Sequence, residues 1–263
     1  MCYDLALAAR LDALLQAVSD INVDAHGIAF EPSLHTQAQA HRRHPVLLFE
    51  DGRYKLKLFE WGVIADYMNT PEKQKKRAQM CNARSEKVVA DPTSYWHRLR
   101  CNRCLVPVTG IFEHRDVTGM KNKIPYHIAI KERRLFFLPA LFQYPTKADV
   151  ETGEVTGTFA IITRRANAVM AQIHNSGDQP FRMPLFLPAH KERMWLQPSL
   201  TDAAMTALLY YEMPADALTC HPVYTIRTTR ERPDGKSKID AYNWPGLPPL
   251  GQDKGKLQTE LFA

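Results

Sequence analysis

The sequence lacks the features that mark several classes of protein. No apolar run approaches the about 18 residues that a membrane-spanning helix needs, so we expect no membrane segment. The first residues contain no basic stretch followed by an apolar stretch and a small-residue cleavage site, so we expect no secretory signal. No internal repeat or low-complexity tract is evident.

Cysteine is sparse, and negative charge is in the minority. The 263 residues contain five cysteines, an odd number that favours free thiols in a reducing compartment over a disulfide framework. Lysine and arginine number 34 against 28 acidic residues, which gives a formal net charge of +6. This excess is compatible with a polyanionic partner. At 45% hydrophobic residues, the chain can bury the core of one large domain or of two small ones.

The second residue is a cysteine. Removal of Met1 would make Cys2 the amino terminus, with a thiol and an α-amine on adjacent carbons. An α-amine has a pKa of about 7.7–8.0, so a sizeable fraction is neutral and nucleophilic at pH 7. With an aldehyde, the amine forms a Schiff base and the thiol then closes a thiazolidine ring. Taken alone, Cys2 favours a simpler interpretation, in which a small apolar residue begins a strand.

Turn residues and hydrophobic periodicity predict a chain rich in hairpins. Residues 45–50 and 53–64 flank Asp51-Gly52, a strong signal for a tight hairpin turn. A second hairpin is predicted from 125–130 and 134–142, whereas 22–45 and the tail from residue 228 are expected to be irregular. The remaining predicted elements are helices over 10–19, 92–100, 166–173, 188–196 and 202–211 and strands over 104–112, 158–163 and 221–227.

Three polar residues follow one another at alternate positions. In an extended stretch, Asn82, Arg84 and Glu86 would lie on one face. Asn and Arg on one face can bind a phosphate or a sugar, because Arg offers a bidentate fork and Asn a donor and an acceptor. The alternative is a polar strand edge with an internal Arg84–Glu86 pair.

Two further residues are candidates for acid–base work. Glu113 follows an apolar run, where desolvation would raise the pKa of its carboxyl group and make it a general acid or base. His174 follows the predicted helix 166–173 and precedes a Gly-containing loop that ends in Arg182-Met-Pro. The plainer alternatives are a surface carboxylate at a strand end and a structural histidine.

A zinc site is a weaker interpretation. Cys101 and Cys104 form a C-x-x-C pair, with His97 and His114 as further candidate ligands. No second cysteine pair supports it, and Cys104 is better explained as the start of a buried strand. We therefore expect neither a metal nor another cofactor.

Seven short motifs occur in one order from Cys2 to about Val223, and together they resemble the SRAP (SOS response-associated peptidase) family. They are Met1-Cys2, Trp61-Gly-Val-Ile, Asn82-Ala-Arg-Ser-Glu86, Arg103-Cys-Leu-Val-Pro107, Gly110-Ile-Phe-Glu113, Ile173-His174 and Arg182-Met-Pro184. The resemblance implies an α+β single domain with a central antiparallel barrel-like β-sheet and flanking helices. It places this domain in 1–227 and leaves 228–263 as an irregular tail.

The resemblance also implies a chemistry. SRAP proteins capture abasic sites in single-stranded DNA. Cys2, exposed when the domain removes Met1, would be the crosslinking nucleophile. Glu113 would perform acid–base work in sugar-ring opening and in self-processing, and His174 would stabilise the open sugar and assist the Schiff base. If Cys2 were sealed inside the protein or acylated, no ring could form.

Four residues would contact DNA on the same grounds. Asn82 and Arg84 fall on the family's Asn-Ala-Arg motif, Arg182 on a phosphate-contacting arginine, and Tyr67 would stack on a base. The family start is usually Met-Cys-Gly-Arg, whereas here Tyr3-Asp4 follows Cys2, which removes a basic DNA contact.

The sequence therefore predicts a cytoplasmic, nucleoid-associated monomer that crosslinks to abasic sites in single-stranded DNA. Two alternatives remain open. One is an N-terminal-nucleophile cysteine hydrolase or peptidase that acts in trans on peptide or amide bonds. The other is a non-catalytic binding module with a structural zinc.

Overall fold

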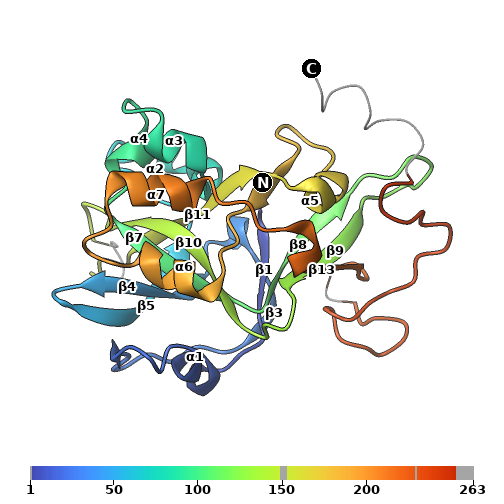
Figure 1. The fold of residues 1–263 in the computed structure, drawn as a ribbon, viewed down its shortest axis with the longest axis horizontal. Coiled ribbons are helices and arrows are strands. Elements are labelled where there is room, and N and C mark those ends of the chain that lie inside the picture. The colour runs from blue at the N-terminus through green and yellow to red at the C-terminus, as the bar shows by residue number, and fades with distance from the viewer. Residues whose placement is uncertain (1, 149–152, 229, 253–263) are drawn as a thin grey trace.

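Two β-sheets carry the fold in the computed structural model, which describes residues 2–148, 153–228 and 230–252 (Figure 1). The smaller sheet has five strands, and every neighbouring pair in it is antiparallel. Its strand order is β13 (Leu218–Pro222), β9 (Ile124–Ile130), β8 (Gly110–Arg115), β1 (Asp4–Leu7) and β3 (Ser33–Gln37). The N-terminal strand is thus an inner strand, which fixes the residues that immediately precede it.

The larger sheet curls back on itself. Its order is β12 (Arg182–Pro184), β11 (Thr158–Arg165), β10 (Phe136–Gln143), β7 (Arg103–Val108), β4 (Arg43–Glu50), β5 (Arg53–Trp61) and β2 (Val23–Asp24), and β6 (Asn82–Arg84) pairs with β11. Because β11 also pairs with β5, five strands form a ring, although only two residue pairs close it. The expected barrel-like sheet is therefore present in a loosely closed form. It is mainly antiparallel, with parallel pairings of β11–β5, β11–β6 and β2–β5.

Short helices flank the larger sheet, as Figure 1 shows, and the fold is α+β as expected. The α-helices are α1 (Leu11–Ala17), α2 (Pro71–Gln74), α3 (Ser85–Val89), α4 (Tyr95–Arg98), α5 (Ala168–Ile173), α6 (Ala189–Trp195) and α7 (Asp202–Leu209), and 3-10 turns cover Ala38–Ala40, Arg77–Met80 and Ala215–Ala217. Within the described residues, no helix is long and apolar enough to cross a membrane.

Both faces of the larger sheet are buried, and alternate residues of its strands belong to two different cores. In β4, Val46 and Leu48 pack into a core that also contains residues of the smaller sheet. Leu47 points to the other core, where the helices contribute Trp195 and Leu208. Side chains of successive strand residues point to opposite faces, so a strand that is covered on both sides is apolar throughout. This is why the central strands read as continuous apolar runs.

The first hairpin is confirmed. β4 and β5 pair antiparallel from Arg43↔Glu60 to Glu50↔Arg53. Asp51 and Gly52 have φ values of 52° and 76°. Two left-handed central residues are what a two-residue hairpin turn of type I′ requires, and Asp-Gly tolerates this conformation.

The second predicted hairpin is wrong, because β9 and β10 belong to different sheets. The predicted strand over 104–112 likewise divides at Thr109 into β7 and β8, one in each sheet. The two errors have one cause. The segment that contains β7 and β8 lies beside the segment that contains β9 and β10, and both pass from one sheet to the other at the same place. Hydrophobic alternation predicts an extended chain but does not indicate which partner it pairs with.

Other local predictions need smaller corrections. The expected irregular stretch 22–45 contains β2, β3 and the start of β4, and the last named strand covers Leu218–Pro222 rather than 221–227. Residues 82–86 are not extended throughout, because α3 begins at Ser85 and places Glu86 in its first turn.

The C-terminal residues 230–252 contain no helix or named strand, but they pack against the domain. Val223 forms an isolated bridge with Ala241, and the Trp244 indole donates to the carbonyl oxygen of Val223 at 2.9 Å. Arg115 donates to the carbonyl oxygens of Pro248 and Pro249. These contacts hold the described part of the tail against the smaller sheet; the predicted division at residue 227 stays a prediction.

Candidate functional site

A cleft of about 680 Å³ lies where β1, β6 and β8 meet the loop between α5 and β12. Four of the predicted site residues line it: Asn82, Arg84, Glu113 and His174. They come from positions up to 92 residues apart, and the fold brings them together. The cleft is the natural candidate for the functional site, because its polar groups converge in a concavity.

Cys2 does not line this cleft. Its neighbours Tyr3 and Asp4 do, but the Cys2 side chain is fully buried beneath them. Burial raises the pKa of the Cys2 thiol well above its usual range, and the charges of Glu113 and Asp4 raise it further. The expectation of a ready, exposed nucleophile is therefore not met while the residue sits in this position. Met1 lies outside the described residues, so its removal stays a prediction.

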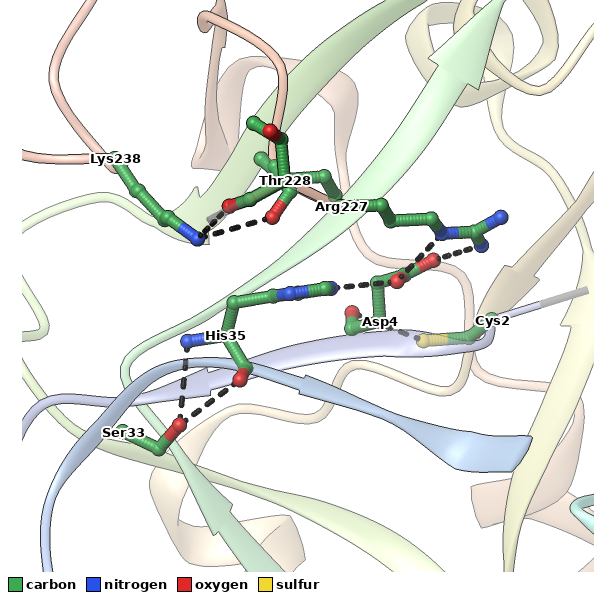
Figure 2. Close-up of polar contacts among 8 residues, drawn as sticks. Cys2, Asp4, Ser33, His35, Arg227, Thr228 and Lys238 are labelled. Atoms are coloured by element: carbon green, nitrogen blue, oxygen red, sulfur yellow. Dashed lines mark hydrogen bonds and ion pairs between the residues drawn. The ribbon is translucent and has the colours of Figure 1, made fainter. Parts of the chain in front are cut away.

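Cys2 is packed in the buried core, and among the described residues few hydrogen bonds add to that packing. It precedes β1 and so makes no ladder hydrogen bonds of that strand. The side-chain amide of Asn82 donates to the Cys2 carbonyl oxygen at 2.9 Å. The Cys2 Sγ atom lies 3.9 Å from the carbonyl oxygen of Asp4 (Figure 2). Since a thiol is a weak donor, the Asn82 contact is the stronger tether. Reaction at the Cys2 thiol therefore requires this residue to leave its buried position.

Asn82 thus has a role that sequence patterns do not reveal. It lies in β6, which is buried against β11 with Asn82 opposite Ile161. The Asn82 Nδ2 atom donates to the Cys2 carbonyl oxygen, while the Asn82 Oδ1 atom is buried without a hydrogen-bond partner among the described residues. A buried unsatisfied acceptor is costly and often marks a place that a ligand completes. The predicted contact between Asn82 and DNA stays a prediction.

Glu113 lies in β8, and its carboxyl group is buried in the cleft wall. Burial raises the pKa of Glu113 to about 8, so the carboxyl group carries a proton at pH 7. Its Oε1 atom has no hydrogen-bond partner within the described chain. A neutral acid with a free oxygen facing a cleft is suited to general acid catalysis near neutral pH.

His174 caps the C-terminal end of α5, and its ring orientation is fixed by the backbone. The N–H of Arg182 donates to Nδ1 at 3.1 Å, and the N–H of Phe181 donates to the His174 carbonyl oxygen at 2.8 Å. Phe181 has a left-handed φ of 60°, which turns two successive N–H groups toward His174. Because a backbone N–H can only donate, Nδ1 is the acceptor and Nε2 carries the proton in the neutral ring.

Glu113 and His174 face each other without forming an ion pair. The His174 Nε2 atom lies 3.8 Å from Glu113 Oε2, beyond hydrogen-bond distance. Burial lowers the pKa of His174 to about 3, so the imidazole is neutral at pH 7 while Glu113 is protonated. The cleft wall therefore holds two neutral groups that can each donate a hydrogen bond, Glu113 from its carboxylic acid and His174 from its Nε2–H.

The other predicted DNA contacts lie in different settings. The Arg84 Nε atom donates to Gln179 at 3.2 Å in the cleft wall. Arg182 instead makes a bidentate pair with Glu86, at 2.7 and 2.9 Å, and donates to the Thr163 carbonyl oxygen. The internal pair of this region is thus Arg182–Glu86 rather than Arg84–Glu86. The predicted phosphate contact of Arg182 stays a prediction, and it would require this pair to open.

Tyr67 is half exposed and lies outside the cleft lining. Its ring packs edge-on against Tyr95 at 5.8 Å, and Tyr95 packs edge-on against Trp96 at 5.7 Å. Trp96 does line the cleft, so three aromatic rings lead from the cleft to the surface. The neighbouring aromatics in the predicted helix 92–100 were the signal that could have pointed to Trp96.

The zinc interpretation finds no geometric support. Cys101 is exposed, Cys104 is buried in β7, and the His97 ring bonds to the Val88 carbonyl oxygen. His114 lines the cleft in the other sheet. Across residues 2–148, 153–228 and 230–252, no three histidine, cysteine, aspartate or glutamate side chains are grouped to hold a metal.

The fold and the cleft define the class: an α+β protein with a candidate active site at the start of its N-terminal strand. Residues 1–227 match the SOS response associated peptidase (SRAP) family, and the chain belongs to this family. The family assignment made from the seven motifs is confirmed.

Relatives and solved structures agree with this assignment. The chain is 29% identical over 172 residues to the abasic site processing protein YoqW of Bacillus subtilis, an alignment that covers 65% of this chain and 70% of YoqW. It is 28% identical over 177 residues to the abasic site processing protein YobE of the same organism, covering 67% and 74%. A crystal structure of a Bacteroides thetaiotaomicron protein matches with a TM-score of 0.69 and 28% identity, over 91% of this chain and 97% of that one.

Proposed function

We propose that this protein processes abasic sites in single-stranded DNA by forming a covalent crosslink through Cys2 after self-removal of Met1. The observation that carries the proposal is the neutral Glu113–His174 pair beside a cysteine at position 2, in a chain of the SRAP family. The names of the relatives YoqW and YobE support the same substrate. The net charge of +6 is favourable for a polyanion.

The proposed chemistry balances as a condensation. The Cys2 amine adds to C1′ of the open abasic sugar, and the resulting hydroxyl leaves as water when Glu113 supplies a proton, which yields a Schiff base. The Cys2 thiol then adds to the same carbon, a C–S bond forms, and the thiol proton returns to the Glu113 carboxylate, which leaves a neutral thiazolidine nitrogen. The Nε2–H of His174 would donate to the ring-opened sugar. One water is lost overall, and no oxidant, metal or cofactor is required.

Incubation with an oligonucleotide that carries one abasic site tests the proposal. The expected product is a heat-stable adduct whose mass equals that of the protein without Met1 plus the oligonucleotide, less one water. An oligonucleotide with a tetrahydrofuran analogue has no aldehyde and should give no adduct. Turnover of a peptide with no DNA adduct would contradict the proposal and favour the alternative, an N-terminal-nucleophile hydrolase.

Asn82→Ala should slow the reaction more than it weakens DNA binding. The substitution removes the tether to the Cys2 carbonyl oxygen, so the terminal residue is no longer held near its electrophile. Misplacement of a reacting group by about 1 Å can cost about 100-fold in rate, and we expect a loss of about 10- to 100-fold in the adduct-forming rate. Single-turnover kinetics and the affinity for the tetrahydrofuran oligonucleotide check this. A large loss of affinity with an unchanged rate would assign Asn82 to DNA binding instead.

Arg84→Ala should weaken binding of single-stranded DNA about 3- to 10-fold at physiological salt, because Arg84 presents its charge in the cleft wall. The slope of log affinity against log salt concentration should become shallower by about 0.7, the share of one phosphate contact on a single strand. Fluorescence anisotropy over a range of salt concentrations measures both. An unchanged slope would show that Arg84 contacts no phosphate.

A further inference from the structure

A second cleft continues from the candidate active site. It has a volume of about 380 Å³ and shares His114, Lys123 and Arg227 with the larger cleft. The other wall of this second cleft is formed by the segment that follows β13, which contributes Tyr224 and Arg230. A chain that occupies the larger cleft can therefore pass into the second one without leaving the surface. We call this second cleft the arm groove and define it by Lys123, Tyr224, Arg227 and Arg230.

The arm groove is basic. Lys123 and Arg230 are exposed, and neither makes an ion pair within the described residues. No carboxylate belongs to the described lining of this groove. Three cations in one groove, with two of them uncompensated, create a local positive potential that attracts phosphate.

Arg227 is one of the three residues that line both clefts, and a buried carboxylate holds it in place. Its Nε and Nη2 atoms donate to Asp4 at 3.1 and 2.5 Å, and His35 lies 2.7 Å from the same carboxylate (Figure 2). Asp4 is 1% exposed, whereas 45% of the Arg227 side chain remains exposed. Asp4 lies two residues after Cys2, so this anchor ties the arm groove to the strand that carries the proposed nucleophile.

Residues of the C-terminal tail also contact the segment 224–228, which contains Arg227. The Lys238 ammonium group donates to the carbonyl oxygens of Ile226 and Thr228, at 3.2 and 2.9 Å, on either side of Arg227 (Figure 2). The Tyr224 ring stacks on Trp244 with centroids 5.7 Å apart and an interplanar angle of 11°. The groove wall is therefore held from both sides and is largely preorganised for binding.

We propose that the arm groove binds the single strand of DNA on one side of the abasic nucleotide, with phosphates on Lys123, Arg227 and Arg230 and a base against Tyr224. The combination of a basic groove with an aromatic platform is typical of proteins that bind single strands. This inference rests on the proposed function, since it takes the larger cleft as the place of the lesion. It gives the C-terminal segment a role in substrate binding.

The test compares oligonucleotides that contain a tetrahydrofuran analogue and extend by several nucleotides to its 5′ side only, its 3′ side only, or neither. For the wild-type protein, extension on one side should tighten binding and extension on the other should not. In the double variant Lys123→Ala/Arg230→Ala, this gain should disappear, and the salt slope should become shallower by about 1.4, because each single-strand phosphate contact contributes about 0.7. The unextended oligonucleotide should lose less affinity in the variant than the extended one, because Arg230 lines only the arm groove whereas Lys123 also lines the larger cleft.

The matched control is Lys131→Ala/Arg134→Ala, which removes the same two charges from exposed positions beyond the opposite end of β9. This variant should keep the gain from extension. Equal losses for all three oligonucleotides, or the same loss in the control, would overturn the inference. A wild-type protein that forms adducts with aldehyde-bearing DNA but shows no one-sided gain would also overturn it and leave the proposed function intact. A protein that forms no adduct at all would instead contradict the proposed function.

Discussion

Cys2→Ala should form no heat-stable adduct with an oligonucleotide that carries an abasic site. The ring needs a thiol and an amine on one residue, and alanine supplies only the amine once Met1 is removed. A Schiff base without a neighbouring thiol stays reversible, so the variant should be captured only when a borohydride reductant is added. Denaturing gel electrophoresis with and without the reductant, followed by intact mass measurement, separates the two steps.

Cys101→Ala is the matched control, because Cys101 is an exposed free thiol outside the cleft. It should form the adduct at the wild-type rate. Both variants should bind the tetrahydrofuran oligonucleotide as the wild type does, which shows that the cleft is intact. A stable adduct with Cys2→Ala, or loss of the adduct in Cys101→Ala alone, would remove Cys2 from the mechanism.

Glu113→Gln should slow adduct formation by about 10²- to 10⁴-fold, the range expected for loss of a general acid or base. Burial raises the pKa of Glu113 to about 8, so below pH 8 the group can supply the proton that the leaving water requires. The wild-type rate should fall as the pH rises through about 8, and the glutamine variant should lack this decline. Single-turnover rates between pH 6 and 9.5 measure the difference. A variant with the wild-type rate and pH profile would contradict the assignment.

The same substitution should change how stability depends on pH. The folded-state pKa of Glu113 is raised above its unfolded value, so the folded protein binds more protons between pH 4.5 and about 8. The contribution of Glu113 to stability is thus fully present below pH 4.5 and is lost as the pH rises through about 8. Glu113→Gln removes this dependence. The melting temperature of the variant minus that of the wild type should therefore be more positive at pH 9 than at pH 5.

Thermal unfolding at the two pH values checks this result, with Glu132→Gln as the control. Glu132 is exposed in the connection between β9 and β10, away from the cleft. Its substitution should shift the melting temperature by similar amounts at both pH values. If Glu113→Gln behaved in the same way, the carboxyl group would not be a buried acid, and its role in proton transfer would need another explanation.

The local elements could be predicted from the sequence where one segment determines the outcome. The Asp51-Gly52 turn, the helices near 11–17, 189–195 and 202–209 and the buried strand beginning near Cys104 all follow from residue periodicity and turn chemistry. The order of seven motifs was enough to assign the family, and four of the predicted site residues do line one cleft. The strands that pair with β9 and with β10 could not be predicted, because alternating apolar residues specify a strand but not its neighbour.

The sequence by itself determined that a cysteine stands at position 2, that Glu113 ends an apolar run and that the chain carries a positive charge. Only the tertiary structure decided that Cys2 is buried and tethered by Asn82, that Arg182 is paired with Glu86, and that Asp4 holds Arg227 across 223 positions of the chain. The physical reason is that periodicity and turn chemistry act between near neighbours, whereas burial and ion pairing depend on which distant segments the folded sheets bring together.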